Sequence, residues 1–196
     1  MSKTLDFYFD FGSPTAYLAH KRLQQLTEQY ALKVNYIPML LGGVFKLTGN
    51  ASPVSIPAKG KYMLEHDLPR FAKRYSAELN FNPHFPINTL TLMRTAIAAQ
   101  HLGCIDDFID PVFEAVWVQQ KNMGDLEVVA NVLTDAGLDA IALLAQAQEP
   151  AVKAELVAAT EAAVARGVFG TPTLFMDDAM YFGQDRLDFI EETLQA

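Results

Sequence analysis

Two short stretches at opposite ends of the chain contain the residues whose types and positions could do chemistry. Residues 9–14 read as a strand, a tight turn and the start of a helix, so the Ser13 hydroxyl lies beside the free N–H groups of a helix N-terminus. A hydroxyl donor at such a place can stabilise an anion. Residues 170–172 form a Gly-Thr-Pro turn before another strand-like run. The only cysteine is Cys104, so the chain cannot exchange electrons through an internal dithiol.

The histidines and the cysteine offer no further reactive centre. Residues 101–104, His-Leu-Gly-Cys, have a spacing seen in metal sites, but two further ligands are not evident, so we expect a helix end there and no metal. For His20, His66 and His84 no paired nucleophile is evident, and we expect ordinary structural roles, with His84 the one candidate for a binding pocket. The predicted chemistry therefore centres on Ser13.

The first 40 residues predict a β-α-β unit. Residues 5–11 are rich in aromatic side chains and alternate as a strand does. Over residues 14–30 apolar side chains recur at helical spacing, and Pro14 falls at the first helical position, where its missing N–H is tolerated. Residues 33–39 then read as a second strand. We expect the two strands to be parallel, with a right-handed crossover between them.

A long stretch without convincing strand signals follows the second strand. Glycines and prolines punctuate residues 42–57, which we interpret as a loop, while residues 60–76 read as helix. Residues 80–88 contain two prolines and must be irregular. Further helices are predicted at residues 89–102, 106–120, 125–136, 139–148 and 151–166.

The C-terminal part of the chain returns to strands. Residues 173–176 and 179–182, joined by Asp-Asp, predict a β-hairpin, and a final helix is expected with Asp185 as its N-cap. This order predicts an α/β fold, with a thioredoxin-like β-α-β/β-β-α core and a large all-helical insertion. The corresponding division assigns residues 1–40 plus 168–196 to a thioredoxin-like domain and residues 41–167 to a helical insertion domain.

Composition and charge exclude several classes of protein. The 196 residues are 51% hydrophobic, enough for a sizeable core. A net charge of −8 argues against a nucleic-acid partner, because phosphates demand a basic surface. No apolar run approaches the roughly 18 residues of a membrane span, and the first residues do not resemble a signal peptide. With a single cysteine as well, we expect a cytoplasmic protein without membrane contact.

Several motifs, taken together, resemble one known family. They occur at both ends of the chain and in its middle, so the resemblance covers essentially the whole sequence. The motifs are residues 10–14, 17–19, 49–60, 117–125, 167–172 and 182–186. Together they resemble the 2-hydroxychromene-2-carboxylate isomerases and the related kappa-class glutathione transferases, a DsbA-like branch of the thioredoxin superfamily.

The resemblance implies that glutathione is a cofactor and suggests its contacts. Ser13 corresponds to the family's serine, which holds the glutathione sulfur. Thr171 precedes Pro172, which we expect to be cis and to face Ser13, and the Thr171 backbone would pair with the cysteinyl unit. Gln184 and Asp185 match positions that bind the γ-glutamyl end. Thr171 is a departure, because Val or Leu is expected there, and its hydroxyl could alter the polarity of the pocket.

The resemblance also implies an aromatic substrate. Asn50 and Lys59 match glutathione-contacting positions of the kappa-class relatives. The carboxylate of 2-hydroxychromene-2-carboxylate needs a cation, for which Lys46 and Lys59 are candidates, and its ring needs an apolar wall, for which Phe85 and Trp117 are candidates. The implied product is trans-o-hydroxybenzylidenepyruvate, formed during the breakdown of aromatic compounds with glutathione regenerated. By resemblance the protein is expected to be a homodimer.

The physical chemistry of a thiol explains why one hydroxyl could suffice. A free thiol has a pKa of ~8.5. A hydroxyl that donates to the thiolate contributes roughly 1.5–3 kcal/mol, and a helix N-terminus adds roughly 0.3–1 kcal/mol, up to ~2 in sheltered geometry. Together, about 2–4 kcal/mol lower the pKa by roughly 1.5–3 units, so that the thiolate dominates near neutral pH. Ser13 therefore needs no general base.

Alternative interpretations stay open at this point. A kappa-like glutathione transferase or peroxidase would keep the glutathione site but consume the thiol, and a glutathione-binding protein would show no turnover. A cap and a carboxylate site use the same N–H groups, so capping and binding are compatible. The local alternatives are a helix cap for Ser13, Gln184 and Asp185, a solvated loop for Asn50 and Lys59, and a core position for Trp117.

Overall fold

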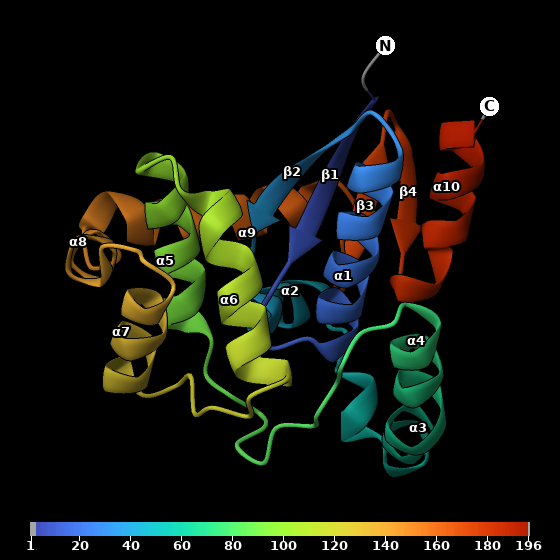
Figure 1. Cartoon of the computed structure of the whole chain (residues 1–196), viewed down its shortest axis with the longest axis horizontal. Coiled ribbons are helices and arrows are strands. Elements are labelled where there is room, and N and C mark those ends of the chain that lie inside the picture. Colours follow the sequence, from blue (N-terminus) through green and yellow to red (C-terminus); the bar gives the residue numbers. More distant parts are fainter. Residues whose placement is uncertain (1–2, 196) are drawn as a thin grey trace.

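A four-stranded mixed sheet organises the fold in the computed structural model, which describes residues 3–195 (Figure 1). Residues 1, 2 and 196, which the predicted domain division includes, lie outside the described residues. The strand order β2-β1-β3-β4 places β1 at the centre, and the β-α-β unit and the hairpin are confirmed. The strands are β1 (Lys3–Phe9), parallel to β2 (Leu32–Pro38) and antiparallel to β3 (Thr173–Met176), which pairs with β4 (Ala179–Phe182).

Helices cover both faces of the sheet because side chains alternate along β1. Leu5, Phe7 and Phe9 are buried in the larger core, on the side of α1 (Pro14–Gln29) and α10 (Leu187–Gln195). Tyr8 belongs to a second cluster, which includes Val44 and Ala163 from the two helices on the opposite side. These helices are α2 (Leu41–Thr48) and α9 (Pro150–Ala165).

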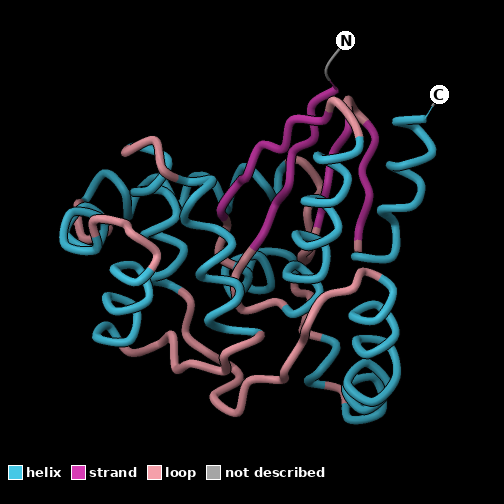
Figure 2. The backbone as a smooth tube through the Cα atoms, viewed as in Figure 1, coloured by secondary structure: helices cyan, strands magenta, loops and turns pink. Residues whose placement is uncertain are grey.

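The chain between β2 and β3 is helical, as predicted, and no strand occurs within that described stretch (Figure 2). The predicted helix over residues 60–76 is interrupted by a π-helical turn, Met63–Asp67. The division into two domains stays a prediction. Besides α2 and α9, the helices of this stretch are α3 (Pro57–Tyr62), α4 (Leu68–Arg74), α5 (Leu90–His101), α6 (Ile105–Trp117), α7 (Leu126–Asp135) and α8 (Ala140–Gln146).

The interpretation of residues 42–57 as a loop is wrong in its first part, which is helix α2. Glycine lowers helix propensity by about 1 kcal/mol relative to alanine, so a Gly-Gly pair argues against a helix. Packing against α9 overrides that preference, because a Cβ on Gly43 would lie 3.0 Å from Cγ2 of Thr160. The missing side chain therefore lets the two helices approach closely. The rest of the segment is irregular apart from a 3-10 turn, Pro53–Ser55.

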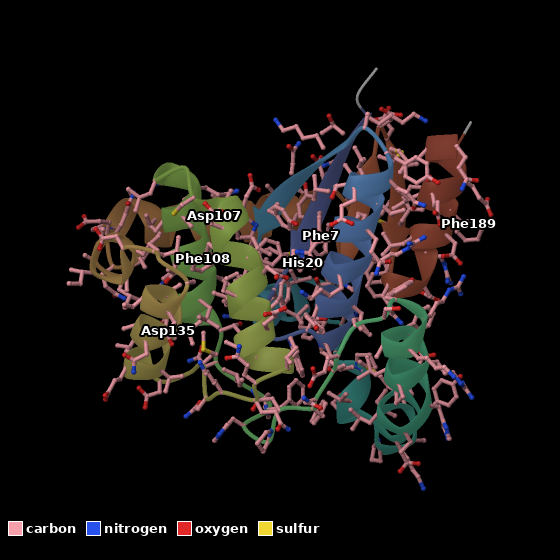
Figure 3. The ribbon with its side chains drawn as sticks, viewed as in Figure 1. Phe7, His20, Asp107, Phe108, Asp135 and Phe189 are labelled. Atoms are coloured by element: carbon pink, nitrogen blue, oxygen red, sulfur yellow. The ribbon has the colours of Figure 1, made fainter. Side chains whose placement is uncertain are left out.

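A buried polar network joins α1 to β2 and α6. His20, labelled in Figure 3, is 2% exposed. Its Nδ1 lies 3.1 Å from the Tyr36 hydroxyl oxygen, and its Nε2 lies 2.9 Å from Oδ1 of Asp110. Lys21 donates from Nζ to the same Asp110 oxygen at 2.7 Å and to Glu114 at 2.8 Å. The network therefore ties the first helix to the helical insertion through a histidine that is shielded from water.

We expect this network to lose stability in acid. Burial lowers the pKa of His20 from 6.5 against the opposing effect of Asp110. Burial opposes ionisation of Asp110, but hydrogen bonds from His20 and Lys21 lower the pKa of Asp110 from 3.8 to about 2. Both pKa values are depressed in the folded state, so the unfolded chain binds these protons first. The free energy of unfolding should therefore fall as the pH drops below 6.5, and further below 3.8.

Urea unfolding at several pH values measures this effect. In the range just below pH 6.5, His20→Gln should remove a dependence of at most about 1.4 kcal/mol per pH unit. The matched control is His66→Gln, which changes an exposed histidine and should leave the dependence unchanged. An identical pH dependence in wild type and His20→Gln would show that His20 is not responsible.

Candidate functional site

A cavity of about 910 Å³ opens where β1 and β4 end and β3 begins. At this end of the sheet the connecting loops gather, along the lower ends of the strands in Figure 2. Its walls come from segments far apart in the sequence: the turn between β1 and α1, the region from α2 to the π-helical turn, residues 85–89, and the segments flanking the hairpin. The two stretches singled out in the sequence, around Ser13 and around Thr171, therefore meet in one cavity.

Ser13 caps α1 and is 4% exposed. Its Oγ accepts a hydrogen bond from the Ala16 N–H at 3.1 Å, which is the geometry of the helix cap given above as the alternative role of Ser13. The cap uses a lone pair of the oxygen and leaves the hydroxyl proton for another partner. In this structure the proton can reach the carbonyl oxygen of Thr171, 3.3 Å away. Capping and anion binding by Ser13 are therefore compatible.

The Thr171–Pro172 peptide bond is cis and faces Ser13, as predicted. The Thr171 hydroxyl donates to the carbonyl oxygen of Tyr8 at 3.1 Å. The hydroxyl proton is therefore satisfied by the last part of β1, while Thr171 still lines the cavity. A second cis bond, Phe85–Pro86, also lies in the cavity wall, and the sequence reading did not anticipate it.

Asp10 is a buried carboxyl in the cavity wall that sequence reasoning missed. Its Oδ1 accepts the Gly12 N–H at 2.9 Å and its Oδ2 accepts the Leu41 N–H at 2.8 Å, so it ties the turn that carries Ser13 to the start of α2. Burial raises the pKa of Asp10, while the two backbone hydrogen bonds oppose that rise. An aspartate directly at the end of an apolar strand is the signal that could have identified it.

The glutathione positions named from the sequence all border this cavity. Asn50 donates from Nδ2 to the carbonyl oxygen of Phe169 at 2.8 Å, which links the end of α2 to the loop before β3. Gln184 is 5% exposed, and its backbone carbonyl oxygen accepts a hydrogen bond from the Tyr75 hydroxyl at 2.6 Å. The Asp185 carboxylate pairs with Arg186 and lies in a 3-10 turn, so the prediction that it caps the final helix is wrong. The glutathione positions that border the cavity are Ser13, Asn50, Lys59, Thr171, Pro172, Gln184 and Asp185.

Of the four substrate candidates, Lys59 and Phe85 line the cavity, whereas Lys46 and Trp117 do not. Lys46 follows the cavity-lining Phe45 in α2, and a helix turns its next side chain by about 100°, so Lys46 lies on the exposed face. Trp117 is 0% exposed and donates from Nε1 to the carbonyl oxygen of Phe11 at 2.8 Å. Trp117 is therefore a core residue. Among the lining residues, Arg186 is a cation that the sequence reading did not include.

Neither a metal site nor a membrane span is found among the described residues. Across residues 3–195 no cluster of three His, Cys, Asp or Glu side chains is arranged to hold a metal ion. His101 instead lies 2.9 Å from a Glu155 carboxylate oxygen. In the same part of the chain, every helix is too short or too polar to cross a membrane.

Comparison with known proteins identifies the family. The DsbA-like thioredoxin domain model matches residues 4–195. A 2-hydroxychromene-2-carboxylate isomerase of Sphingobium xenophagum is 34% identical over 196 residues, which cover 99% of each chain. The chain belongs to this DsbA-like isomerase family. A solved 2-hydroxychromene-2-carboxylate isomerase structure has a TM-score of 0.88 at 31% identity, covering 98% of this chain and 94% of that one. Glutathione S-transferase kappa 1 of Rattus norvegicus is 25% identical over 202 residues, covering 96% and 89%.

Membership of the DsbA-like isomerase family confirms the predicted fold class. The residues of the site also argue against thiol–disulfide exchange. Thiol–disulfide exchange in thioredoxin-like proteins uses a Cys-x-x-Cys motif, whereas residues 13–16 of this family member read Ser-Pro-Thr-Ala. The fold therefore carries a hydroxyl where a dithiol enzyme carries its reactive sulfur.

Proposed function

We propose that this protein converts 2-hydroxychromene-2-carboxylate into trans-o-hydroxybenzylidenepyruvate with glutathione as a thiol cofactor. Three relatives that are 2-hydroxychromene-2-carboxylate isomerases, 32–34% identical over nearly the whole chain, support the isomerase activity. The placement of Ser13 is the observation that supports glutathione as the cofactor. The Ser13 hydroxyl stands at the N-terminus of α1, opposite the cis Thr171–Pro172 bond, where no protein thiol is available.

The cavity has groups that fit a γ-glutamyl tripeptide thiol. Ser13 would donate to the sulfur, and the Thr171 backbone would pair with the cysteinyl unit. The Gln184 amide borders the cavity and would donate to and accept from the γ-glutamyl end. Asp185 would bind the ammonium group and Lys59 a carboxylate, because both line the cavity and carry the matching charges.

When bound, glutathione supplies a thiolate that adds reversibly to a conjugated carbon and leaves again, so that rotation about a former double bond becomes possible. The protein's part is to keep the sulfur ionised and the substrate in place. The Ser13 hydroxyl and the N-terminus of α1 stabilise the negative charge. Phe85 and the Phe169–Phe182 pair, whose ring centroids are 4.4 Å apart, provide apolar wall for an aromatic ring. Lys59 and Arg186 are the lining cations that can attract the substrate carboxylate.

Spectrophotometric turnover of 2-hydroxychromene-2-carboxylate tests this function. We expect isomerisation by the purified protein with glutathione and little without it. Turnover that is independent of glutathione would contradict the cofactor, and the absence of turnover with glutathione would contradict the substrate. The homodimer stays a prediction from the resemblance, and the cytoplasmic location stays a prediction from the sequence.

We also expect glutathione to be needed only in catalytic amounts. An isomerase releases the thiol in each cycle, so the concentration of free thiol under anaerobic conditions should stay constant while product accumulates. The kappa-class relative provides the second candidate function, a transferase, which would consume one thiol per turnover. Thiol titration during turnover distinguishes the two, and loss of thiol in step with product would favour the transferase.

A further inference from the structure

Two hydroxyl groups meet at one carbonyl in the wall of the cavity. Thr15, in the first turn of α1, places its Oγ1 2.9 Å from Oγ of Ser13. Both hydroxyl oxygens lie 3.3 Å from the carbonyl oxygen of Thr171. Both side chains border the cavity, Ser13 buried and Thr15 half-buried. The three polar groups therefore form a closed triangle at the place proposed for the sulfur.

The triangle offers three contacts, but two hydroxyls supply only two protons. The Ser13 oxygen already accepts the Ala16 N–H, so its single proton goes to Thr171, to Thr15 or to a ligand. If the proton turns to a ligand, the Thr171 carbonyl loses its Ser13 donor. Thr15 is already within reach of that carbonyl and can supply the missing hydrogen bond. The second lone pair of the carbonyl stays available for a ligand N–H.

We propose that Thr15 is a positioning residue whose hydroxyl frees the Ser13 proton for the sulfur of glutathione. The inference rests on the proposed function, because it needs a thiol ligand beside Ser13. Without the Thr15 hydroxyl, the Thr171 carbonyl and the sulfur compete for one proton. With it, the carbonyl keeps a side-chain donor whether or not the sulfur is present.

The pKa of the glutathione thiol in its complex with the protein, read from the ultraviolet absorbance of the thiolate, tests this role. Thr15→Val keeps the branched shape and removes the hydroxyl, whereas Thr15→Ser keeps the hydroxyl. We expect the pKa to rise by about 0.4–1.1 units in Thr15→Val, the effect of one neutral hydrogen bond, and to stay at the wild-type value in Thr15→Ser. Thr134→Val makes the same change on an exposed part of α7 and should have no effect.

The charged side chains around the thiol are the same in wild type and in every variant. A change in the thiol pKa therefore reports the loss of the Thr15 hydroxyl. The charged side chains that line the cavity are Asp10, Lys59, Asp67, Asp185 and Arg186.

Two outcomes would overturn the role of Thr15. One is a wild-type thiol pKa in Thr15→Val, and the other is an equal rise in Thr15→Ser, which would attribute the effect to shape. Thr15→Ala is the second hydroxyl-free variant, used if the valine protein does not fold. Calorimetric titration with glutathione separates the two levels of failure. If wild-type protein binds no glutathione, the proposed function is overturned as well. If wild type and Thr15→Val both bind glutathione and the thiol pKa is the same in the two complexes, only the role of Thr15 is overturned.

Discussion

Ser13→Ala is expected to lower the isomerase kcat/KM by about 10–150-fold, the effect of losing one charge-assisted hydrogen bond of roughly 1.5–3 kcal/mol. The pKa of bound glutathione should rise at the same time, because the hydroxyl stabilises only the ionised thiol. The fold should stay intact. Since Ser13 also caps α1, the free energy of unfolding should fall by about 0.5–2 kcal/mol.

A matched cap variant separates the two roles of Ser13. The Asp139 side chain accepts the Ala142 N–H at 3.0 Å and caps α8, and Asp139 does not border the cavity. Asp139→Ala should therefore lose a similar amount of stability and keep wild-type kinetics. If Ser13→Ala turned over substrate at the wild-type rate with glutathione, the proposed sulfur contact would be wrong.

Trp117→Ala is expected to lower the free energy of unfolding by about 3–5 kcal/mol, the usual effect of truncating a large buried aromatic side chain. Trp117 is fully buried, and the change would also remove the N–H that satisfies the Phe11 carbonyl. Trp117→Phe keeps most of the packing and leaves that carbonyl without its donor, which should lower stability by about 1–3 kcal/mol. Chemical denaturation measures both effects.

Kinetics of the folded Trp117→Phe protein test whether the residue also contacts substrate. At a temperature where the variant is folded, we expect the wild-type KM for 2-hydroxychromene-2-carboxylate, because the ring does not reach the cavity. A raised KM with unchanged stability would restore the role as a substrate wall that the sequence suggested. Phe85→Leu is the comparison, since Phe85 does line the cavity.

The fold was predictable from the sequence because its signals are local. Aromatic alternation marks β1, caps and stop glycines mark most helices, and the Asp-Asp turn marks the hairpin. Helix α2 was not predictable, because its formation depends on Gly43 fitting against Thr160, a residue far along the chain. The misplaced loop also bears on Lys46, which is an exposed residue of helix α2 outside the cavity lining.

The candidate site was predictable where a motif fixes the backbone and was not predictable where side chains meet. Ser13 follows from a helix start, and the cis bond before Pro172 follows from the resemblance to thioredoxin-like proteins. Thr15 stands two residues after Ser13, but only the folded backbone shows that it shares the Thr171 carbonyl. The burial of Trp117 depends on residues distant in the sequence, because its ring packs against Phe81 and Phe85 and its N–H donates to the Phe11 carbonyl.

The central position of β1 has a consequence for the order in which this protein is built on the ribosome. Phe7 pairs with Tyr36 on one side and with Leu174 on the other. The β3 side of β1 therefore stays unpaired until almost the whole chain has emerged. Until then a nascent chain presents Ser13 with no wall opposite it and an apolar strand edge open to other chains. The cavity beside Ser13 is thus among the last parts of the molecule to form, because the segment around Thr171 that lines it comes from the end of the chain.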